Sequence, residues 1–384
     1  MKIKNIMKII LYCVLDHPYV SVVDINLTTK CNHKCVYCEI GQGLMKKEQI
    51  KNETNSLDLE DLKWIIDQMN QCRIPSLVLL GGEPFLFKDV FEVLEYASTY
   101  LSDITIITNG MLIPRLSDSQ IALLKRTNCK IILSLDSFNP ETHNRIRGVE
   151  TAFENAIHGI KILVENQIPV QIETVISLYN YQDLANVVRN ADALGVSSVN
   201  FVPIITASNF SGVQAIPHKE ELNPKPDHMR FLDDEFNEIL KFERDHAIQT
   251  NVSDLKRWLQ HYITFHAHQA PDSDFFFKYR LQRLICLNLY SRIKINAFGE
   301  VQPCNLIPSS ITIHDNPNRS LVDVWNISCT QIRTAMKEQK YPEQCHGCYG
   351  PHSMNILLST IKYPFSNRAN IPGFLRETIQ KLRK

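Results

Sequence analysis

The chain of 384 residues lacks an excess of charge of either sign, because 41 lysines and arginines balance 41 aspartates and glutamates. No net basic field is available to attract nucleic acid, so we expect no nucleic-acid partner. Glycine (13 residues) and proline (18 residues) are scarce, which excludes collagenous and low-complexity classes. No run of about 18 uncharged apolar residues occurs, and we therefore expect neither a membrane span nor a membrane partner.

What the chain does have is length and cysteine. At about 150 residues per domain, 384 residues predict two or three domains. Lys2, Lys4 and Lys8 precede the apolar run 9–15 in the manner of a secretion signal, but the run is short and lacks a small-x-small cleavage site. We therefore expect a buried first helix and a cytoplasmic protein. In that reducing compartment, eleven cysteines favour metal ligands or catalysts over disulfides.

Short β-branched runs alternate with amphipathic helical segments from about residue 20 to residue 204, the pattern of βα units on a parallel sheet. This pattern predicts an α/β fold, either a partial barrel or an open parallel sheet, with the active site at the carboxyl ends of the strands. One helix starts with a predicted capping box, Thr151 with Glu154. The six predicted strands are 22–27, 77–80, 104–108, 130–135, 170–176 and 198–202.

Residues 205–280 break this rhythm. A zinc site formed by His261, His266 and His268 is one interpretation, but no His-Glu-x-x-His spacing is present. We favour a helical linker or lid. The segment holds six histidines: His218, His228, His246, His261, His266 and His268.

Three cysteines follow the first predicted strand as Cys31-x3-Cys35-x2-Cys38, and their thiols can all turn inward on one compact loop. A structural zinc site normally takes four ligands, with two C-x2-C pairs as its usual spacing, and no fourth cysteine lies nearby in the sequence. A four-iron cluster held by three thiolates instead keeps one iron open to a further ligand. We favour that cluster over zinc.

This loop, with Tyr37 before its last cysteine, resembles the defining C-x3-C-x-aromatic-C loop of the radical S-adenosylmethionine (SAM) superfamily. The resemblance implies a partial (β/α)6 barrel with a 4Fe-4S cluster at the end of its first strand. It further implies that the open iron chelates SAM, which an electron from the cluster cleaves to methionine and a 5′-deoxyadenosyl radical. That radical abstracts a hydrogen atom from substrate, and a flavodoxin or ferredoxin is the expected electron donor.

Further segments resemble motifs of the same superfamily. Gly81-Gly82-Glu83-Pro84 resembles its GGEP segment, which implies contacts with the methionine amine. Thr108-Asn109-Gly110 and Ser134-Leu135-Asp136 resemble its TNG and S-x-D segments. Residues 143–148 resemble an H-D-x-x-R-G segment in which Asn144 replaces the aspartate, and Arg147 aligns with the arginine that pairs with the SAM carboxylate. The resemblance thus implies that SAM is bound by Tyr37, Gly82, Glu83, Asn109, Ser134, Asp136 and Arg147.

A second set of cysteines lies far downstream. Residues 293–302 predict a β-hairpin that turns at Gly299. The C-x12-G-x4-C spacing around this hairpin, with a later C-x2-C pair, resembles the twitch and SPASM auxiliary-cluster domains, and the shorter twitch type in particular. The resemblance implies a small α+β domain with one auxiliary 4Fe-4S cluster, whose four thiolate ligands leave no open iron. Tetrahedral zinc is the alternative for the same four residues, Cys286, Cys304, Cys345 and Cys348.

The remaining cysteines have simpler interpretations. Cys329 lies between the two auxiliary pairs and could substitute for one of their ligands. Cys13, Cys72 and Cys129 lie in apolar surroundings, so we expect them to be buried small hydrophobic residues.

These features predict five segments and an enzyme. The leading hypothesis is a net two-electron oxidation of a small hydroxylated or aminated molecule, with the auxiliary cluster as electron acceptor. A ribosomal-peptide maturase that makes a crosslink, epimer or thioether is the alternative, although many such enzymes carry a leader-binding domain before the barrel and only 30 residues precede Cys31. A non-catalytic metal-binding scaffold is a third hypothesis.

From position alone, Asp136, His143 and Glu173 are the candidates for a general base. The predicted segments are an N-terminal extension (1–20), the barrel (21–204), the linker or lid (205–280), the auxiliary-cluster domain (281–350) and a tail (351–384).

Overall fold

The computed structural model of this chain describes residues 19–44, 56–205, 216–256, 286, 288–315, 320–338, 340 and 342. All six predicted strands are present within one residue or two of their expected bounds, and each pairs in parallel with the next along the chain. The predicted α/β fold of the partial-barrel type is confirmed. The six strands are β1 (Val22–Asn26), β2 (Ser76–Leu80), β3 (Asp103–Thr108), β4 (Lys130–Ser134), β5 (Val170–Ile176) and β6 (Ser198–Pro203).

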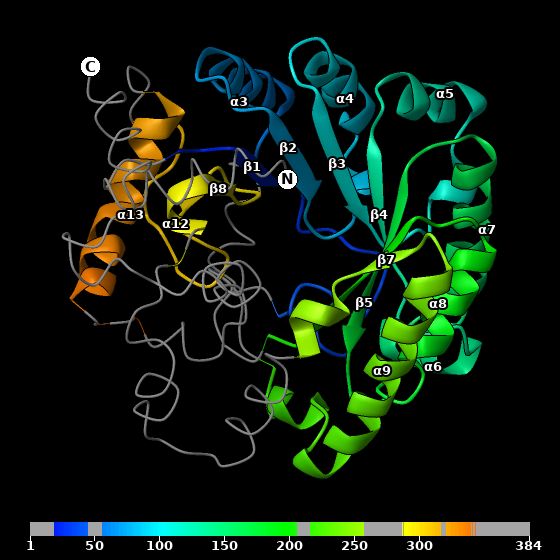
Figure 1. The fold of residues 1–384 in the computed structure, drawn as a ribbon. Coiled ribbons are helices and arrows are strands. Elements are labelled where there is room, and N and C mark those ends of the chain that lie inside the picture. The colour runs from blue at the N-terminus through cyan, green and yellow to red at the C-terminus, as the bar shows by residue number, and fades with distance from the viewer. Residues whose placement is uncertain are drawn as a thin grey trace, which may run out of the picture.

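Three further strands extend this sheet at both edges (Figure 1). Strand β7 (Gln249–Thr250) pairs in parallel with β6. At the other edge, β8 (Arg292–Ile295) pairs in parallel with β1 and antiparallel with β9 (Val301–Gln302). The predicted hairpin is therefore confirmed, and it continues the barrel sheet. The expected domain boundary near residue 280 lies outside the described residues.

A buried charge cluster fixes the register between β1 and β8. Asp24 is 3% exposed and accepts a hydrogen bond of 2.7 Å from Arg292, and it also pairs with Lys294. These side chains come from parts of the chain that are some 270 residues apart in sequence. Because a buried carboxylate without a partner is costly, a one-residue shift of β8 would be strongly unfavourable.

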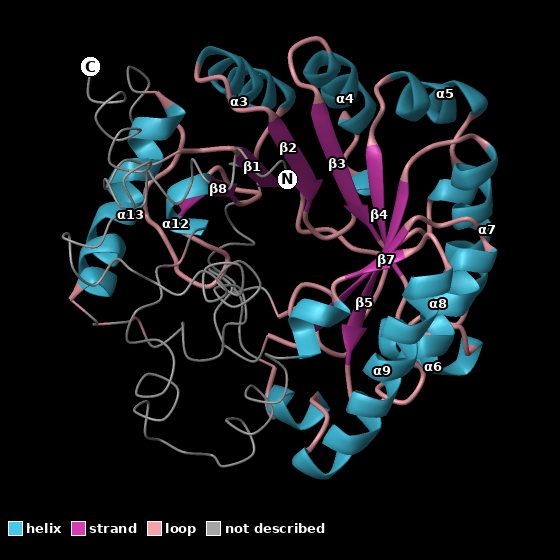
Figure 2. Cartoon of the chain, viewed as in Figure 1, coloured by secondary structure: helices cyan, strands magenta, loops and turns pink. Residues whose placement is uncertain are grey.

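Helices cover the outer face of the sheet, as Figure 2 shows. Outward-facing strand positions such as Leu77 and Leu79 are fully buried beneath them, whereas Val78 between these two is only half-buried. Burying one such leucine contributes about 1.5–3 kcal/mol. The helices are α3 (Leu59–Gln71), α4 (Val90–Ser98), α5 (Asp118–Arg126), α6 (Pro140–Arg147), α7 (Ala152–Glu165), α8 (Leu184–Ala193), α9 (Met229–Asp245), α12 (Asn288–Ser291) and α13 (Leu321–Lys337).

The start of α7 differs from its prediction. Thr151 is the N-terminal cap residue but makes no side-chain capping hydrogen bond, so the expected capping box with Glu154 is wrong. The side chain of Asn144, from the end of α6, accepts a hydrogen bond of 2.8 Å from the amide of Phe153 instead. An orphan amide of the helix terminus is thus satisfied by a residue from the preceding helix. None of the described helices is long and apolar enough to cross a membrane.

Candidate active site

The three-cysteine loop follows β1 and lies against the end of α6. The amides of Lys34 and Val36 donate hydrogen bonds to the carbonyl oxygens of Arg147 and Ile146, at 3.0 and 2.9 Å. This backbone pairing holds the loop at the carboxyl end of the sheet. The structure thereby places Cys31, Cys35 and Cys38 at the edge where an α/β sheet carries its active site.

Each sulfur of this loop faces a hydrogen-bond donor. The Sγ atom of Cys31 lies 3.5 Å from the amide of His33, and that of Cys38 lies 3.5 Å from the amide of Gly41. The Sγ atom of Cys35 lies 3.8 Å from Nη1 of Arg147. Burial raises the pKa of Cys35 to about 12; the guanidinium of Arg147 opposes this rise, and the thiols of Cys38 and Cys31 add to it. The three thiols are therefore close enough to repel one another as thiolates, so a bound cation would stabilise them strongly.

The GGEP segment packs directly on this loop. A Cβ atom added to Gly82 would lie 2.1 Å from the carbonyl oxygen of Lys30, and its amide donates a hydrogen bond of 2.7 Å to Thr28. Gly81 adopts a φ of +145°, in the region that favours glycine. Both glycines are thus required by the close approach of two backbones.

Glu83 joins the GGEP and TNG segments. Its carboxylate accepts hydrogen bonds from the Thr108 hydroxyl at 2.7 Å and from the amides of Asn109 and Phe85 at 2.9 and 3.2 Å. The Asn109 side chain in turn donates to Asn32 at 2.7 Å. Burial raises the pKa of Glu83, and these three donors oppose that rise. Because protein groups already occupy both carboxylate oxygens, the contact of Glu83 with a methionine amine stays a prediction, and its evident task is to hold the two turns together.

Asp136 and Arg147 form a fully buried ion pair beneath the loop. The Nε atom of Arg147 lies 2.7 Å from Oδ2 of Asp136, and Tyr37 donates a hydrogen bond of 3.2 Å to the same oxygen. The other oxygen accepts from the amide of Val175 at 3.0 Å. The guanidinium also lies 5.8 Å from the centre of the Tyr37 ring. Arg147 therefore links the S-x-D segment to Cys35, a contact that sequence reasoning missed.

His143 supports this pair from below. Its Nδ1 atom accepts a hydrogen bond of 3.1 Å from the amide of Asp136, which assigns the ring proton to Nε2. The side chain is fully buried, and burial lowers its pKa well below the usual value, with the charge of Arg147 adding to the shift. His143 is thus held neutral as a positioning residue.

The neutral state of His143 predicts that the protein loses stability in mild acid. Below pH 6.5 the unfolded chain binds a proton at His143 that the folded chain does not, so the free energy of unfolding falls as the pH falls. The expected slope from this residue is about 1.4 kcal/mol per pH unit. Urea unfolding at pH 7, 6 and 5, in one fixed metal state, measures it. His143→Gln should flatten the profile, while the exposed His314→Gln should not; parallel profiles for wild type and His143→Gln would contradict the assignment.

Glu173 has fewer protein partners than Asp136, the other carboxylate among the candidate bases. It faces the inner side of the sheet on β5, in register with Ser134 on β4 and Asn200 on β6. The side chain of Asn200 donates to its Oε2 atom at 3.2 Å, the one side-chain hydrogen bond found for this carboxylate among the described residues. Burial raises the pKa of Glu173, and Asn200 and Arg147 oppose that rise. The inner face therefore carries a row of three half-buried polar side chains beside the site.

A second buried ion pair attaches the loop to the segment after β6. Lys219 lies 2.7 Å from Glu39, the residue after Cys38, and their side chains are 7% and 3% exposed. In addition, the amide of Leu178 donates to the carbonyl of Leu222 at 2.7 Å. Part of the predicted linker or lid, around Lys219–Leu222, thus packs against the cysteine loop. Nothing in the sequence pattern pairs these two residues.

We expect the Lys219–Glu39 pair to be costly to break. Lys219→Met leaves a buried carboxylate without a partner and should lower the free energy of unfolding by about 3–5 kcal/mol. The double variant Lys219→Met/Glu39→Leu should recover most of that loss, since no charge is then left buried. Arg126→Met, which breaks a pair with both side chains 64% exposed, is the control and should cost at most about 1 kcal/mol. Equal losses in Lys219→Met and Arg126→Met would refute the expectation.

The downstream cysteines are described only in part. Cys286 and Cys304 lie beside the β8–β9 hairpin, whereas Cys345 and Cys348 lie outside the described residues, as do Cys13, His261, His266 and His268. Burial raises the pKa of Cys286 to about 12, and the thiol of Cys304 adds to it, so these two are neighbours. No three His, Cys, Asp or Glu side chains among the described residues converge on a single metal-ion position.

Cys129 is buried as predicted, but the prediction for Cys72 is wrong. Cys72 is exposed, because it caps α3 after the apolar face of that helix has ended.

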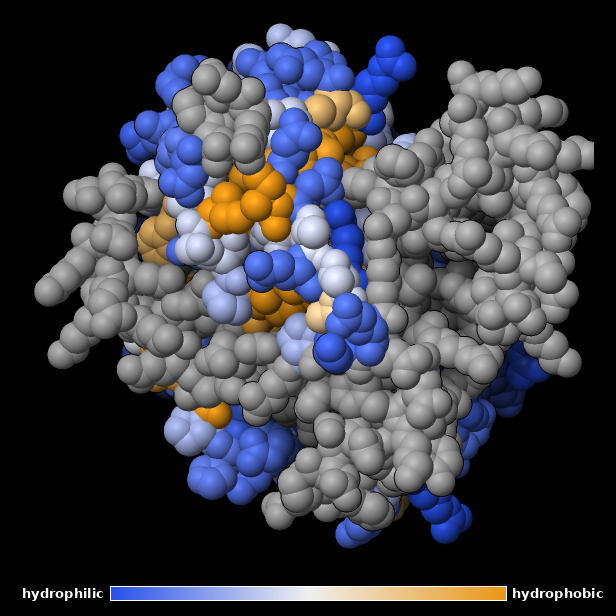
Figure 3. All heavy atoms as spheres, turned by 90° about the vertical axis from the view of Figure 1, so that its left-hand side faces the viewer, coloured by the Kyte–Doolittle hydropathy of each residue, from blue (hydrophilic) through white to orange (hydrophobic). Residues whose placement is uncertain are grey.

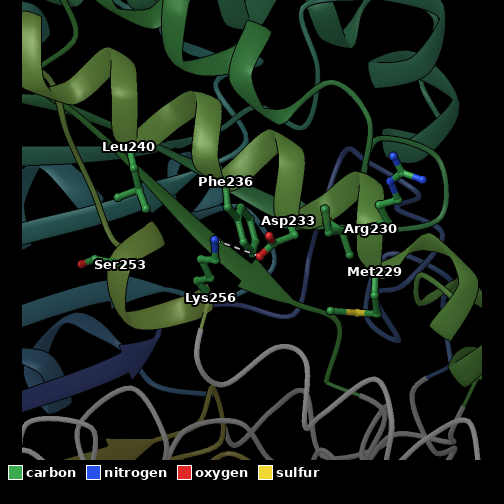
Figure 4. A pocket seen from close by; sticks show the side chains of 8 residues that line it. Met229, Arg230, Asp233, Phe236, Leu240, Ser253 and Lys256 are labelled. Atoms are coloured by element: carbon green, nitrogen blue, oxygen red, sulfur yellow. Dashed lines mark ion pairs between the residues drawn. The ribbon is translucent and has the colours of Figure 1, made fainter.

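One pocket of about 490 Å³ lies away from this site, along α9 (Figure 4). Lys256 and Asp233 form an ion pair of 2.9 Å across it. None of the residues predicted to bind cluster, SAM or substrate lines this pocket, whose lining is Met229, Arg230, Leu232, Asp233, Phe236, Leu240, Ser253 and Lys256.

Residues 25–191, which carry this site, match the sequence profile of the Radical SAM superfamily. This part of the chain is a radical SAM domain. Radical SAM enzymes use a 4Fe-4S cluster and SAM, the two cofactors that the cysteine loop predicted. The membership predicted from the loop and the GGEP segment is confirmed.

The similarity of this chain to known proteins extends beyond the barrel. The chain is 25% identical over 331 residues to the AdoMet-dependent heme synthase of Methanosarcina barkeri, covering 84% of this chain and 86% of that protein. It is 25% identical over 348 residues to the antilisterial bacteriocin subtilosin biosynthesis protein AlbA of Bacillus subtilis, covering 84% and 66%. Among solved structures, Streptococcus suis SuiB bound to precursor peptide SuiA superposes with a TM-score of 0.61 at 17% identity, covering 91% of this chain and 74% of that one. At this identity the superposition speaks for the fold alone.

Proposed function

We propose that Cys31, Cys35 and Cys38 hold the 4Fe-4S cluster of this radical SAM enzyme. The observation that carries the proposal is that three thiols of one short loop at the carboxyl end of the sheet each face an N–H donor. Donors to sulfur are the usual outer contacts of a thiolate-ligated cluster, so the residues fit the group. When bound, the cluster and SAM supply a radical that removes one hydrogen atom from the substrate.

We assign the contacts to SAM to residues around the same loop. Gly82 gives backbone access where no Cβ atom fits. Asn109 follows β3 and contacts the cysteine loop through Asn32, and Ser134 ends β4 beside Glu173. Tyr37 and Asp136 serve mainly by orienting Arg147, whose guanidinium is the one cation found against a loop sulfur among the described residues. The charge of Arg147 suits the SAM carboxylate, as the sequence motif implied.

The reaction that we propose is the oxidation of a small hydroxylated or aminated molecule. Once a hydrogen atom has left the substrate carbon, formation of a carbonyl or imine requires the loss of one proton and one electron. We assign the proton to Glu173, because it faces the inner side of the sheet and is the candidate base least occupied by protein partners. His143 and Asp136 hold other groups. Cys286, Cys304, Cys345 and Cys348 would hold an auxiliary cluster, which would serve as the acceptor for this electron.

A ribosomal-peptide maturase is the second candidate. It is favoured by the alignment with the subtilosin biosynthesis protein AlbA, which extends over 84% of this chain and so reaches past the barrel. In this alternative the same site would act on a side chain or an α-carbon of a peptide.

The experiment is a substrate screen with a labelled product. Protein reconstituted anaerobically with iron, sulfide, SAM and a strong reductant is incubated with deuterated aminopolyols or with deuterated peptides. The proposal expects deuterium in 5′-deoxyadenosine with the small molecules, and Glu173→Gln should retain this transfer while losing the oxidised product. Transfer from peptides alone would establish the alternative, and no 5′-deoxyadenosine under any condition would contradict both.

We propose that the protein works in a reducing cellular compartment. All described cysteines are free, and cluster ligands must be reduced thiols. This supports the cytoplasm, where a flavodoxin or ferredoxin would supply the electron.

A further inference from the structure

Arg333 on α13 is a buried cation for which the described part of the chain offers no carboxylate partner. It is 7% exposed; its Nε atom donates to the carbonyl of Leu289 at 2.7 Å and its Nη1 atom to the side chain of Asn326 at 2.9 Å. The guanidinium lies 4.6 Å from the ring centre of Trp325 and 5.0 Å from that of Tyr290. Its Nη2 atom is buried and has no hydrogen-bond partner among the described residues, nor does any described carboxylate form an ion pair with Arg333.

Such a charge is expensive to bury. Removing an ion from water costs several kcal/mol, and two cation–π contacts at about 2 kcal/mol each offset only a part of that cost. A buried cation is normally retained because an anion faces it. The free Nη2 atom marks the side of the guanidinium on which that anion is to be sought.

A thiol lies near Arg333 on the same helix, and two further thiols belong to segments that α13 contacts. Cys329 lies one helical turn before Arg333, on the same face of α13, and is fully buried. The carbonyl that accepts from Arg333 belongs to Leu289, whose amide donates to the backbone carbonyl oxygen of Cys286 at 3.1 Å. The hydroxyl of Ser328 donates to the carbonyl of Val301 at 3.0 Å, which attaches α13 to the strand just before Cys304.

Electrostatics agree with this placement. Burial raises the pKa of Cys329 to about 12; the charge of Arg333 opposes the rise, and the thiols of Cys304 and Cys286 add to it. The charge of Arg333 thus acts on Cys329, whose thiol is within electrostatic range of Cys304 and Cys286, while Lys294 is the described cation that acts on Cys304. Helix α13 lies beside the β8–β9 hairpin in Figure 1, and Figure 3 views the molecule from this side.

We propose that Arg333 is the counter-charge of an anionic thiolate–metal centre built on Cys286 and Cys304, and that it raises the reduction potential of that centre. The inference rests on the auxiliary cluster of the proposed function and names the residue that tunes it. A fixed positive charge favours the reduced cluster, which carries one more negative charge than the oxidised one. Arg333 acts here as a positioning and electrostatic residue and touches no substrate.

The test is a redox titration of the reconstituted holoenzyme followed by electron paramagnetic resonance. In Arg333→Met, at the potential where the wild-type auxiliary cluster is half reduced, the ratio of reduced to oxidised cluster should fall at least tenfold, which is 59 mV for a one-electron couple. Arg333→Lys keeps the charge and should stay within threefold of wild type. The matched control is Arg126→Met, which removes a guanidinium that is 64% exposed on α5 and should shift neither cluster.

Iron and zinc content and 5′-deoxyadenosine release complete the test. An unchanged potential in Arg333→Met with full iron content would overturn the inference, as would zinc in place of the second cluster. If Arg333→Met loses the auxiliary iron, retention of that iron by Arg333→Lys supports a charge role, and its loss from both variants refutes one. Failure of the proposed function is a separate result, since wild-type protein would then release no 5′-deoxyadenosine while the auxiliary potential could still be measured.

Discussion

Cys35→Ala should abolish the release of 5′-deoxyadenosine from SAM. The loop offers only three thiolates to the proposed cluster, so removing one leaves two protein ligands and an unfilled iron. Cys35 is also the proposed ligand whose sulfur faces Arg147, at 3.8 Å, so the variant leaves that guanidinium without its sulfur partner. Iron bound per chain should fall by about four atoms, the content of one 4Fe-4S cluster.

Two cysteine controls make this result specific. Cys72→Ala removes an exposed thiol at the end of α3 and should change neither iron content nor 5′-deoxyadenosine release. Cys129→Ala removes a fully buried thiol remote from the loop in sequence and should lower stability without changing iron. If Cys35→Ala kept its full iron, or if Cys72→Ala lost as much iron as Cys35→Ala, the three-cysteine loop would not be the cluster site.

The fold could be predicted because its signals are local. Each strand is a short apolar run and each covering helix has an apolar face, so period alone located β1–β6 within one or two residues. The loop motifs were equally local: three cysteines within eight residues, and polar turns directly after strands. The same reasoning explains why β8 was predicted as part of a hairpin with β9 but not as the neighbour of β1, whose register depends on Asp24 and Arg292, far apart in sequence.

The contacts that shape the site were not predictable, because they join residues that are far apart in the sequence. Lys219 and Glu39 are separated by 180 positions, and neither residue type in isolation indicates a buried pair. Glu83 carried a motif that implied a ligand contact, yet the structure shows its oxygens occupied by Thr108 and Asn109. A motif identifies which residues meet at the site, whereas hydrogen-bond partners depend on the packing of the loops around them.

Asn144 illustrates how a departure from a motif can be explained by structure. In the segment 143–148 it stands where an aspartate was expected from the resemblance. Its side-chain oxygen accepts from Phe153 and its amide donates to the carbonyl of Glu150. An aspartate could accept the first bond but could not donate the second, so the amide suits a residue that joins α6 to α7.

Arg147→Met should be the most damaging single change outside the cysteines. Its guanidinium is the ion-pair partner of Asp136, at 2.7 Å with side chains 6% and 0% exposed, so the variant leaves a fully buried carboxylate without a cation. The free energy of unfolding should fall by about 3–5 kcal/mol. Because the residue also supports Cys35, cluster affinity or 5′-deoxyadenosine release should fall about 10–100-fold.

Conservative and neighbouring variants separate charge from geometry in this prediction. Arg147→Lys keeps the charge but replaces the planar fork with a single ammonium, which cannot face Asp136 and Cys35 together, so it should rescue stability only in part and activity little. Arg145→Met is the matched control, because Arg145 is on the same helix, is exposed, and stacks on the ring of Tyr179 with its guanidinium 4.2 Å from the ring centre. Urea unfolding and 5′-deoxyadenosine assays on the three variants give the comparison. Should Arg147→Met match Arg145→Met in both measurements, the buried pair would hold neither the fold nor the cluster loop, and the role assigned to Arg147 would have to be abandoned.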